Sequence, residues 1–307
     1  MKNKLTIPKR IQLETFYGCN ASCTMCVIDF PTNRKKGIMP LEMSKYILDE
    51  LSLYKDEIDK LDLFGLGEPL LDPYIFQRIK YAKEKGFRNI AISTNADLLD
   101  KEKQKKLLEI GIDTVLFSID GVKKETHEKI RRGVKFERVV ENCQSIIKMR
   151  DEGDYKTRFV IRFIRQDTNK DEWEAFRKFW RPKLSKETRE KRDLIILYDV
   201  NTLGGEIYCK RNLIKEQEED PKIEKKPCHM VFDRLIVLSN GSVPLCCEDI
   251  LKAKYCLGNV KNSSLIEIFN CEKLDKIRKI HLEGKKNTLD ICRECTVLYS
   301  EKKQVRI

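Results

Sequence analysis

The sequence lacks the features of a membrane or secreted protein. No run of residues approaches the roughly 18 to 20 apolar positions that a membrane-spanning helix needs. The first residues, Met1–Leu5, lead into a predicted strand and carry no apolar signal segment, so we expect a cytoplasmic protein. Low-complexity tracts are also missing, and 41% of the 307 residues are hydrophobic. The chain is therefore expected to fold as one large domain, or as one large and one small domain.

The features of a nucleic-acid-binding protein are missing as well. The net charge is +12, but the 61 Lys and Arg residues are scattered along predicted helical faces among 49 acidic residues. The chain has no basic arm and no alternation of basic and aromatic residues. We therefore expect a solvated, lysine-rich surface, with neither nucleic acid nor membrane as a partner. Attraction of an anionic substrate is the alternative interpretation of the charge.

Cysteine, in contrast, is abundant, with twelve residues in the chain. In a cytoplasmic protein these are expected to include metal ligands rather than disulfides. Cys19, Cys23 and Cys26 have the spacing C-x3-C-x2-C and follow the alternating run Ile11–Phe16, which predicts a strand that leads into a cysteine-rich loop. Thiolates bind iron–sulfur clusters or zinc, and a cubane cluster needs one ligand for each iron. Three cysteines leave one iron free for another ligand, whereas a structural zinc site would need a fourth ligand from elsewhere.

The first two hundred residues alternate between short apolar strands and amphipathic helices. The predicted strands are Gln12–Phe16, Lys60–Phe64, Asn89–Ser93, Thr114–Ile119, Arg158–Phe163 and Asp193–Tyr198. The predicted helices are Glu42–Tyr54, Pro73–Lys85, Lys101–Ile110, Phe136–Arg150 and Asp171–Trp180. This alternation predicts parallel βα units with right-handed crossovers. Six such units indicate an α/β fold, an open or partial barrel whose chemistry lies at the carboxyl ends of its strands.

Polar and glycine-containing segments follow three of the predicted strands. Gly65–Pro69 allows close backbone approach to a ligand and supplies one carboxylate, Glu68, for a cation. Ser93–Asn95 and Ser118–Gly121 place hydroxyl and amide groups where a polar ligand could be held. Each segment by itself is also compatible with an ordinary turn or a helix N-cap.

Together with the cysteine loop, these segments resemble the radical S-adenosylmethionine (SAM) superfamily. The C-x3-C-x2-C loop matches the signature of that family's catalytic [4Fe–4S] cluster, and Leu66–Pro69 resembles its Gly-Gly-Glu-Pro segment, with Leu66 in place of the first glycine. The resemblance implies a partial (β/α)6 barrel in which Cys19, Cys23 and Cys26 are the catalytic cluster ligands and SAM binds the open iron. It further implies SAM-binding roles for Gly67, Glu68, Pro69, Ser93, Asn95, Ser118, Asp120 and Arg131.

The resemblance also assigns individual contacts to the cofactor. Glu68 and its backbone neighbours would hold the methionine amine, and Ser118, with Arg131, would contact the carboxylate. Ser93 and Asn95 would face the ribose. Gln166, after the fifth strand, is a weaker candidate for the cofactor or substrate pocket.

The strand–helix alternation stops after about Asn201, where a charged connector, residues 210–227, leads into a cysteine-rich region. We expect a barrel over residues 1–209 and a smaller α+β domain over 210–307. The smaller domain is predicted to contain a β-hairpin over Arg234–Leu245 with an Asn-Gly turn. Helices near Leu265–Phe269 and Leu274–Leu282 are predicted to follow.

Four cysteines of this second region are expected to hold a metal centre: Cys228, Cys246, Cys292 and Cys295. Four thiolates fully ligate a cubane, although a structural zinc site has the same requirement. Cys247 could replace Cys246 as the ligand. The arrangement resembles the SPASM and shorter twitch extensions of the superfamily, which implies an auxiliary [4Fe–4S] cluster.

The remaining cysteines and the three histidines are expected to have simpler roles. Cys143 lies on an amphipathic helix and is predicted to be in the core. A structural role is favoured for Cys209, Cys256 and Cys271, although one of them, or Cys247, could return a hydrogen atom to a substrate radical, as in the family's epimerases. His127 and His281 are predicted at the surface, and His229 as a polar neighbour of Cys228.

The leading functional hypothesis is a radical SAM enzyme that abstracts hydrogen from a sugar- or cyclitol-type molecule and oxidises or epimerises it. A reducing partner such as flavodoxin or ferredoxin is implied. A peptide-modifying enzyme is the first alternative, and it is less favoured because Met1–Arg10 is too short for a leader-recognition domain. A non-catalytic iron–sulfur electron carrier and a zinc-binding interaction module are further alternatives.

Overall fold

A computed structural model describes residues 5–185, 193–205, 225–298 and 305–306. Its centre is an eight-stranded sheet with the order β11-β1-β5-β6-β7-β9-β10-β14. Seven of these strands are parallel, and the last is antiparallel to β10. The strands are β1 (Arg10–Leu13), β5 (Lys60–Asp62), β6 (Ile90–Thr94), β7 (Thr114–Ser118), β9 (Arg158–Arg165), β10 (Leu194–Asp199), β11 (Arg234–Val237) and β14 (Val305–Arg306).

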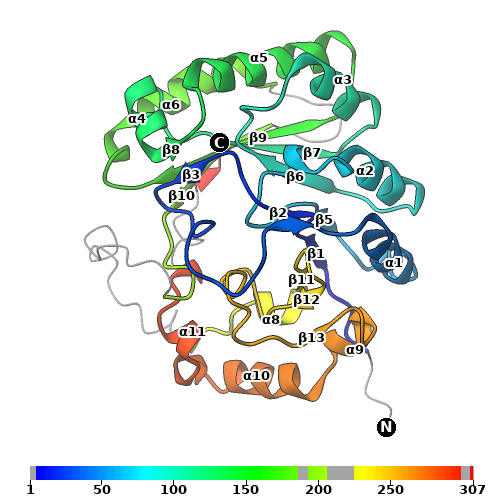
Figure 1. The fold of residues 1–307 in the computed structure, drawn as a ribbon. Coiled ribbons are helices and arrows are strands. Elements are labelled where there is room, and N and C mark those ends of the chain that lie inside the picture. Colours follow the sequence, from blue (N-terminus) through cyan, green and yellow to red (C-terminus); the bar gives the residue numbers. More distant parts are fainter. Residues whose placement is uncertain (1–4, 186–192, 206–224, 299–304, 307) are drawn as a thin grey trace.

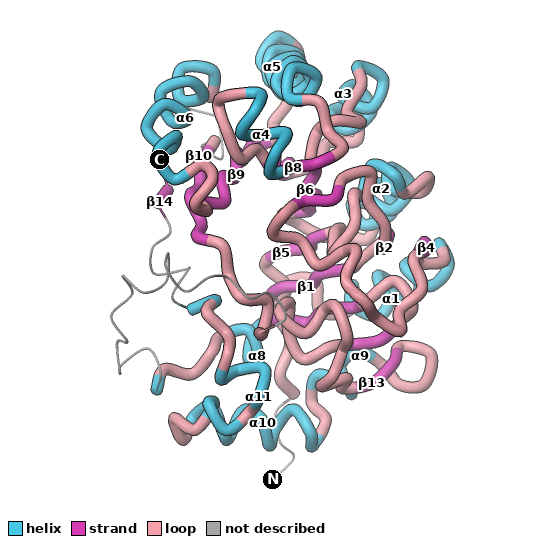
Figure 2. Tube along the Cα trace, turned by 60° about the vertical axis from the view of Figure 1, so that its left-hand side comes forward, coloured by secondary structure: helices cyan, strands magenta, loops and turns pink. Residues whose placement is uncertain are grey.

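The helices of the first part of the chain cover the outer face of this sheet (Figure 1). Each turns an apolar stripe inward, as α1 does when it buries Ile47, Leu48 and Leu51. The helices are α1 (Leu41–Ser52), α2 (Ile75–Glu84), α3 (Lys101–Glu109), α4 (Lys124–Ile130), α5 (Phe136–Glu152) and α6 (Trp173–Trp180), with short 3-10 turns at Pro69–Leu71, Lys170–Glu172 and Arg181–Lys183. The sheet curves into a partial barrel with these helices on its outside (Figure 2).

The predicted α/β fold with a partial barrel is confirmed, as are the six predicted strands within a few residues. Helix α4 was not predicted. The prediction of a β-hairpin over Arg234–Leu245 was wrong in its pairing. Its first arm, β11, pairs in parallel with β1 and becomes a seventh parallel strand, and its second arm, Ser242–Val243, pairs with Gly258–Asn259. The run Leu235, Ile236 and Val237 is wholly buried, as expected of a parallel strand covered on both faces.

The C-terminal region packs beneath the barrel, next to β1 and α1 (Figure 1). Its elements are α8 (Met230–Asp233), β12 (Ser242–Val243), β13 (Gly258–Asn259), α9 (Leu265–Phe269), α10 (Glu272–Leu282) and α11 (Asp290–Arg293), with a 3-10 turn at Lys286–Thr288. Helix α9 begins with a capping box between Ser264 and Glu267 and contacts α1 through the hydrogen bond from the Ile266 amide to Glu50 Oε1 (3.1 Å). One hydrophobic cluster joins this region to the barrel.

Two predictions concern residues that the structure does not describe. Cys209 lies outside the described residues, as does most of the predicted connector 210–227. The predicted domain boundary at 209/210 falls there too, so it stays a prediction.

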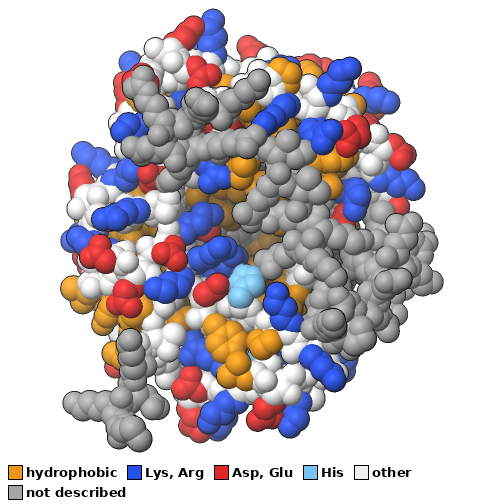
Figure 3. All heavy atoms as spheres, turned by 180° about the vertical axis from the view of Figure 1, so that it is seen from behind, with side chains coloured by type: hydrophobic (Ala, Val, Ile, Leu, Met, Phe, Trp, Pro, Cys, Tyr) orange, Lys and Arg blue, Asp and Glu red, His pale blue; other side chains and the backbone are white. Residues whose placement is uncertain are grey.

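No helix among the described residues is long and apolar enough to cross a membrane. On the face in Figure 3, Lys and Arg side chains alternate with Asp and Glu side chains, as the mixed composition indicates.

Candidate active site

The cysteine loop lies at the carboxyl end of β1, beside a cavity of about 750 Å³. Two pairs of short strands shape it: β2 (Phe16–Tyr17) pairs with β4 (Gly37–Ile38), and β3 (Ser22–Cys23) pairs with β8 (Arg131–Arg132). A turn from the Cys26 amide to the Cys23 carbonyl (3.0 Å) brings the second and third cysteines together. Cys19, Cys23 and Cys26 all line the cavity, as the spacing predicts.

The three sulfurs of the loop are buried enough to favour the neutral thiol when no metal is bound. Burial raises the pKa of Cys19 to about 12 and also raises the pKa values of Cys23 and Cys26. A buried thiolate therefore needs a compensating positive charge, which iron supplies when it binds sulfur. The donor set is three soft ligands with oxygen groups close by, and this fits a [4Fe–4S] cluster that keeps one iron open for SAM.

Gly67 and Glu68 fix the neighbouring wall of the cavity. A Cβ on Gly67 would lie 2.1 Å from the Phe16 carbonyl oxygen, so only glycine fits against the strand that leads to the cysteines. The Glu68 amide donates to the Gly18 carbonyl (2.9 Å). The Glu68 carboxylate accepts from the Thr94 hydroxyl (2.7 Å) and the Asn95 amide (2.8 Å), which ties this segment to the end of β6.

The Glu68 side chain is almost completely buried yet faces the cavity. Burial raises its pKa to about 7, while the hydrogen bonds from Asn95 and Thr94 oppose that rise. A carboxylate in such a site favours a cationic ligand, because a cation restores the solvation that burial removes. Pro69, by contrast, is buried behind Glu68 at the start of the 3-10 turn and is not among the residues that line the cavity.

Ser93, Asn95 and Ser118 line the cavity from the ends of β6 and β7. Arg162, in the middle of β9, joins two of them: its Nη2 donates to the hydroxyls of Ser118 (2.8 Å) and Ser93 (3.1 Å). The sequence reasoning missed Arg162. The signal was present, since Arg162 is a charged residue inside an otherwise apolar predicted strand. Its guanidinium adds a positive charge to the same wall.

Arg131 and Asp120 form a buried pair beside the cysteines. Arg131 lines the cavity, lies 2.7 Å from an Asp120 carboxylate oxygen and donates to the Cys23 sulfur at 3.7 Å. Asp120 is fully buried, accepts from the Ile164 amide (2.7 Å) and does not itself line the cavity. Burial raises the pKa of Asp120, and the Arg131 charge opposes this. Asp120 therefore orients Arg131 rather than facing a ligand.

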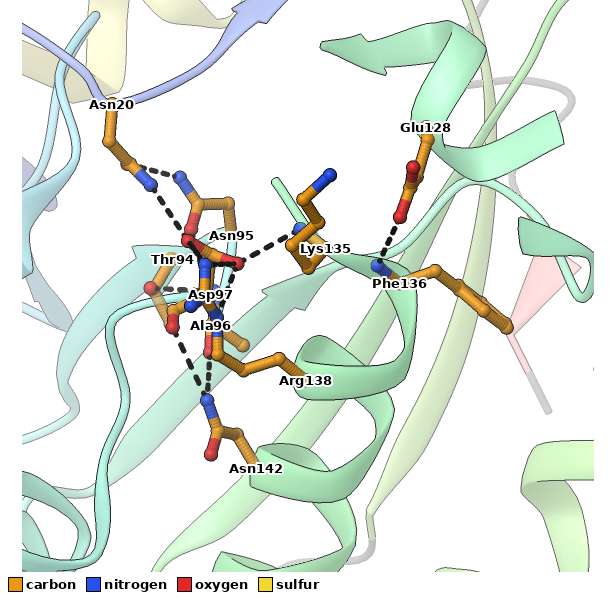
Figure 4. A network of polar contacts seen from close by, with 10 residues as sticks. All are labelled: Asn20, Thr94, Asn95, Ala96, Asp97, Glu128, Lys135, Phe136, Arg138 and Asn142. Atoms are coloured by element: carbon orange, nitrogen blue, oxygen red, sulfur yellow. Dashed lines mark hydrogen bonds and ion pairs between the residues drawn. The ribbon is translucent and has the colours of Figure 1, made fainter. Parts of the chain in front are cut away.

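A network centred on Asp97 supports the loop from behind (Figure 4). Asn20, next to Cys19, donates to Asp97 (3.3 Å) and accepts from Asn95 (2.8 Å). Asp97 also accepts from the Lys135 amide (3.0 Å) and from the Arg138 guanidinium (2.7 Å), both at the start of α5. The cysteine loop, the end of β6 and α5 are thus held as one unit.

The second set of cysteines lines a separate cavity of about 70 Å³ in the C-terminal region. Cys228, Cys246, Cys292 and Cys295 all face it, and burial raises the pKa of Cys292 to about 12. Cys247 lines the larger cavity instead, opposite the cysteine loop. In the described part of the chain, no three His, Cys, Asp or Glu side chains are grouped closely enough to hold a single metal ion. A four-thiolate set of this kind fits a fully ligated cubane.

Two of the three histidines differ from expectation. His127 and His281 were predicted at the surface, but both are fully buried. Helix α4 turns His127 toward Phe136, and α10 turns His281 toward the second cysteine set. His229 lines the larger cavity and contacts Asp233 (3.2 Å), so it is the polar neighbour that was predicted.

The remaining candidates lie outside both cavities. Gln166 accepts from the Thr24 hydroxyl (3.1 Å) and so supports the cysteine loop rather than facing the cavity. Cys143 is buried in the core, as predicted. Cys256 and Cys271 line neither cavity.

Comparison with known proteins agrees with this arrangement. A model of the radical SAM superfamily matches residues 13–179, more than half of the chain, and an iron–sulfur cluster-binding domain, SPASM, matches residues 228–296. Fe-coproporphyrin III synthase of Methanosarcina barkeri is 35% identical over 131 residues, which are 41% of this chain and 31% of that protein. GTP 3',8-cyclase of Chlorobaculum tepidum is 32% identical over 42% of this chain and 38% of that protein. The chain thus spans about a third of the length of these relatives.

Two solved structures share the fold over nearly the whole chain. BtrN, in complex with AdoMet and 2-DOIA, has a TM-score of 0.62 and 18% identity over 95% of this chain and 94% of that chain. Streptococcus suis SuiB, bound to its precursor peptide SuiA, has a TM-score of 0.67 and 15% identity over 97% of this chain and 72% of that chain. At this level of identity the likeness shows the fold alone.

The family follows from the match of the radical SAM model to more than half of the chain. The chain belongs to the radical SAM superfamily, whose cofactors are SAM and a [4Fe–4S] cluster, and carries a C-terminal SPASM domain that binds an auxiliary iron–sulfur cluster.

Proposed function

We propose that this protein abstracts a hydrogen atom from a sugar- or cyclitol-type small molecule and oxidises or epimerises it. When bound, the catalytic cluster supplies the electron that splits SAM into methionine and the 5′-deoxyadenosyl radical that takes this hydrogen. The chain's own residues bind SAM, orient the substrate and keep water from the reacting atoms.

One observation carries the proposal: a single cavity reaches from the cysteine loop to the SPASM domain. Cys19, Cys23 and Cys26 line it on the barrel side, and Cys247 and Glu248 line it on the other side. Its volume of about 750 Å³ falls within the roughly 300–1,000 Å³ of small-molecule sites. A pure electron carrier has no use for a ligand-sized cavity at this place.

The barrel side of this cavity has the groups that SAM needs. In our proposal Cys19, Cys23 and Cys26 hold the catalytic cluster, and the Glu68 carboxylate accepts a hydrogen bond from the methionine amine. Arg131 and Ser118 supply a cation and a hydroxyl for the methionine carboxylate, while Ser93 and Asn95 face the ribose. Gly67 has no side chain, so the backbone can approach closely at this position. The arrangement depends on this close approach.

The cavity also has groups suited to a polyhydroxylated molecule. Tyr198 and Asp199, at the end of β10, and His229 and Glu248, in the C-terminal region, line it, and each side chain has atoms that can hydrogen-bond to a hydroxyl group. Dense hydrogen bonding of this kind orients one C–H bond of a sugar or cyclitol relative to the radical.

A peptide-modifying enzyme is the second candidate. The fold it shares with SuiB supports this reading, because that protein is bound to a precursor peptide. The cavity of about 750 Å³ is large enough for SAM and one sugar-sized molecule, and it is open to the surface, so the substrate test below separates the two candidates. For either reaction we infer a flavodoxin or ferredoxin as electron donor, and a cytoplasmic location.

Anaerobic reconstitution followed by SAM cleavage tests the proposal. We expect about eight iron atoms per chain, since each cubane holds about four, and little zinc. Dithionite and SAM should then release 5′-deoxyadenosine. A panel of C-deuterated cyclitols and amino sugars should reveal the substrate, because its deuterium is transferred to the 5′-deoxyadenosine. Intact clusters without 5′-deoxyadenosine would overturn the enzyme reading. Deuterium transfer only from a peptide would favour the second candidate.

A further inference from the structure

His281 lies between the backbone and the sulfur of two cysteines in the SPASM domain. Its ring is fully buried on α10 and lines the small cavity together with the second cysteine set. The Cys228 amide lies 3.2 Å from Nδ1, and the Cys292 sulfur lies 3.6 Å from Nε2. Both nitrogens of one ring thus contact residues that the sequence predicts as ligands of the auxiliary cluster, and the inference below rests on that cluster being part of the proposed function.

The contact with the Cys228 amide determines where the ring carries its proton. A backbone N–H can only donate, so Nδ1 must present its lone pair to it. A neutral imidazole with an unprotonated Nδ1 carries its single proton on Nε2. That proton faces the Cys292 sulfur, which makes His281 a donor to a thiolate.

Lys286 adds a positive charge at the same cavity. Its side chain is 9% exposed, lines the cavity and donates to the Lys226 carbonyl (2.9 Å). Glu248 also lines this cavity and opposes that charge. The effect of the Lys286 charge is therefore measured by comparing variants of this protein that all keep Glu248.

We propose that His281 donates an Nε2–H···S hydrogen bond to the Cys292 thiolate of the loaded auxiliary cluster and, with Lys286, raises its reduction potential. One-electron reduction adds one negative charge to the cluster and its sulfur ligands. A hydrogen-bond donor and a nearby cation both stabilise that added charge, since hydrogen bonds to sulfur and local charge set cluster potentials. His281 is thus a positioning and tuning residue rather than a cluster ligand.

Potentiometric EPR titration tests this in a protein that lacks the catalytic cluster. The parent is the Cys19→Ala, Cys23→Ala, Cys26→Ala triple variant, expected to hold about four iron atoms. In this background His281→Leu and Lys286→Met should each move the midpoint potential to a more negative value, and the double variant further. His281→Gln, which keeps a side-chain N–H, should recover part of the shift. His127→Leu is the matched control, because His127 is equally buried and also accepts a backbone amide at Nδ1 (Asp120, 3.3 Å), but it lies in the barrel.

A second measurement on the parent needs no change at His281. With ¹⁵N-labelled histidine, the reduced cluster should show hyperfine coupling to a histidine nitrogen and to an exchangeable proton. Absence of that coupling, or a parental midpoint potential in a His281→Leu protein that holds four iron atoms, would overturn the proposal. If Cys292 were not a cluster ligand, Cys292→Ala would retain its iron, and this result does not depend on the midpoint potential of the His281 variants. Failure of the ligand assignment can therefore be told apart from failure of the proposal for His281.

Discussion

Arg131 and Asp120 form an ion pair, 2.7 Å apart, that is buried directly beside the cysteine loop. Antiparallel pairing of β3 with β8 sets Arg131 opposite Cys23, and Asp120 holds the guanidinium from behind. The same side chain thus stabilises a proposed cluster ligand and presents a cation to the cavity. The loop and its neighbouring charge are therefore built as one unit.

Replacement of Arg131 should weaken SAM binding and destabilise the fold. In our proposal Arg131 binds the methionine carboxylate, so Arg131→Met removes a charged hydrogen bond worth about 1.5–3 kcal/mol, and the Kd for SAM should rise about 10- to 100-fold. Asp120 would also remain buried without its partner, at a cost of about 3–5 kcal/mol in the free energy of unfolding. Isothermal titration calorimetry with SAM and urea denaturation measure the two effects.

Lys129→Met provides the control for this variant. Lys129 lies two residues away on α4 and is exposed, so its loss should leave SAM affinity and stability nearly unchanged. A folded Arg131→Met protein with the SAM affinity of the unmodified chain would show that Arg131 only supports Cys23.

Gly67 and Gly37 allow a matched test of the loop geometry. Gly67→Ala places a methyl group 2.1 Å from the Phe16 carbonyl oxygen, whereas a Cβ on Gly37 meets nothing within 4 Å. We expect Gly67→Ala to destabilise the protein by about 1–3 kcal/mol, as overpacking does, and to reduce the iron held by the cysteine loop. Iron analysis of Gly67→Ala and Gly37→Ala measures this effect. Equal iron contents in the two variants would show that the loop tolerates the added methyl group at position 67.

The fold could be predicted from sequence where its signals are local. Hydrophobic periodicity located the strands and helices of the barrel, and the C-x3-C-x2-C spacing located the loop, because both depend on neighbouring residues. The partner of β11 could not be read in this way, since its pairing with β1 joins residues more than two hundred positions apart. Asp120 was likewise predicted as a ligand to the cofactor, and only the buried contact with Arg131 reveals its positioning role.

The burial of His281 could have been predicted from the spacing of apolar residues in the sequence. Leu274, Ile277 and His281 occupy positions i, i+3 and i+7 of α10, so the histidine lies on the apolar stripe. Its burial followed from that spacing, whereas its contact with Cys292 required the fold. His127 had no such signal, because α4 itself was not predicted.

Cys246 and Cys247 are adjacent in sequence but face different cavities, which gives a sharp prediction. Cys246→Ser should lose the auxiliary cluster, about four iron atoms per chain, because Cys246 lines the small cavity with the other three cysteines. Cys247→Ser should keep all its iron, because Cys247 lines the larger cavity. Iron analysis with Mössbauer spectroscopy compares the pair. Iron loss only in Cys247→Ser would reverse the ligand assignment.

The raised pKa of Glu68 predicts how SAM binding depends on pH. Burial raises this pKa from its ordinary value of 4.5 to about 7, so below pH 7 the folded chain holds a proton on the carboxyl group. Protonation removes the carboxylate charge that, in our proposal, accepts a hydrogen bond from the methionine amine, and SAM should therefore bind more tightly as the pH rises from 6 to 8. Between pH 4.5 and 7 the unfolded chain has released this proton and the folded chain has not. The contribution of Glu68 to the free energy of unfolding therefore falls as the pH rises through that range.

Calorimetry with SAM at pH 6, 7 and 8 measures the effect on binding. The affinity of the unmodified protein should rise by up to about tenfold per pH unit below pH 7 and level off above it. Glu68→Gln should bind SAM weakly at every pH, with a flat profile, because no charge is gained. Glu42→Gln, at an exposed position on α1, should keep the profile of the unmodified protein. A flat profile in the unmodified protein, together with unchanged affinity in Glu68→Gln, would mean that Glu68 serves only to join Gly67 to the end of β6.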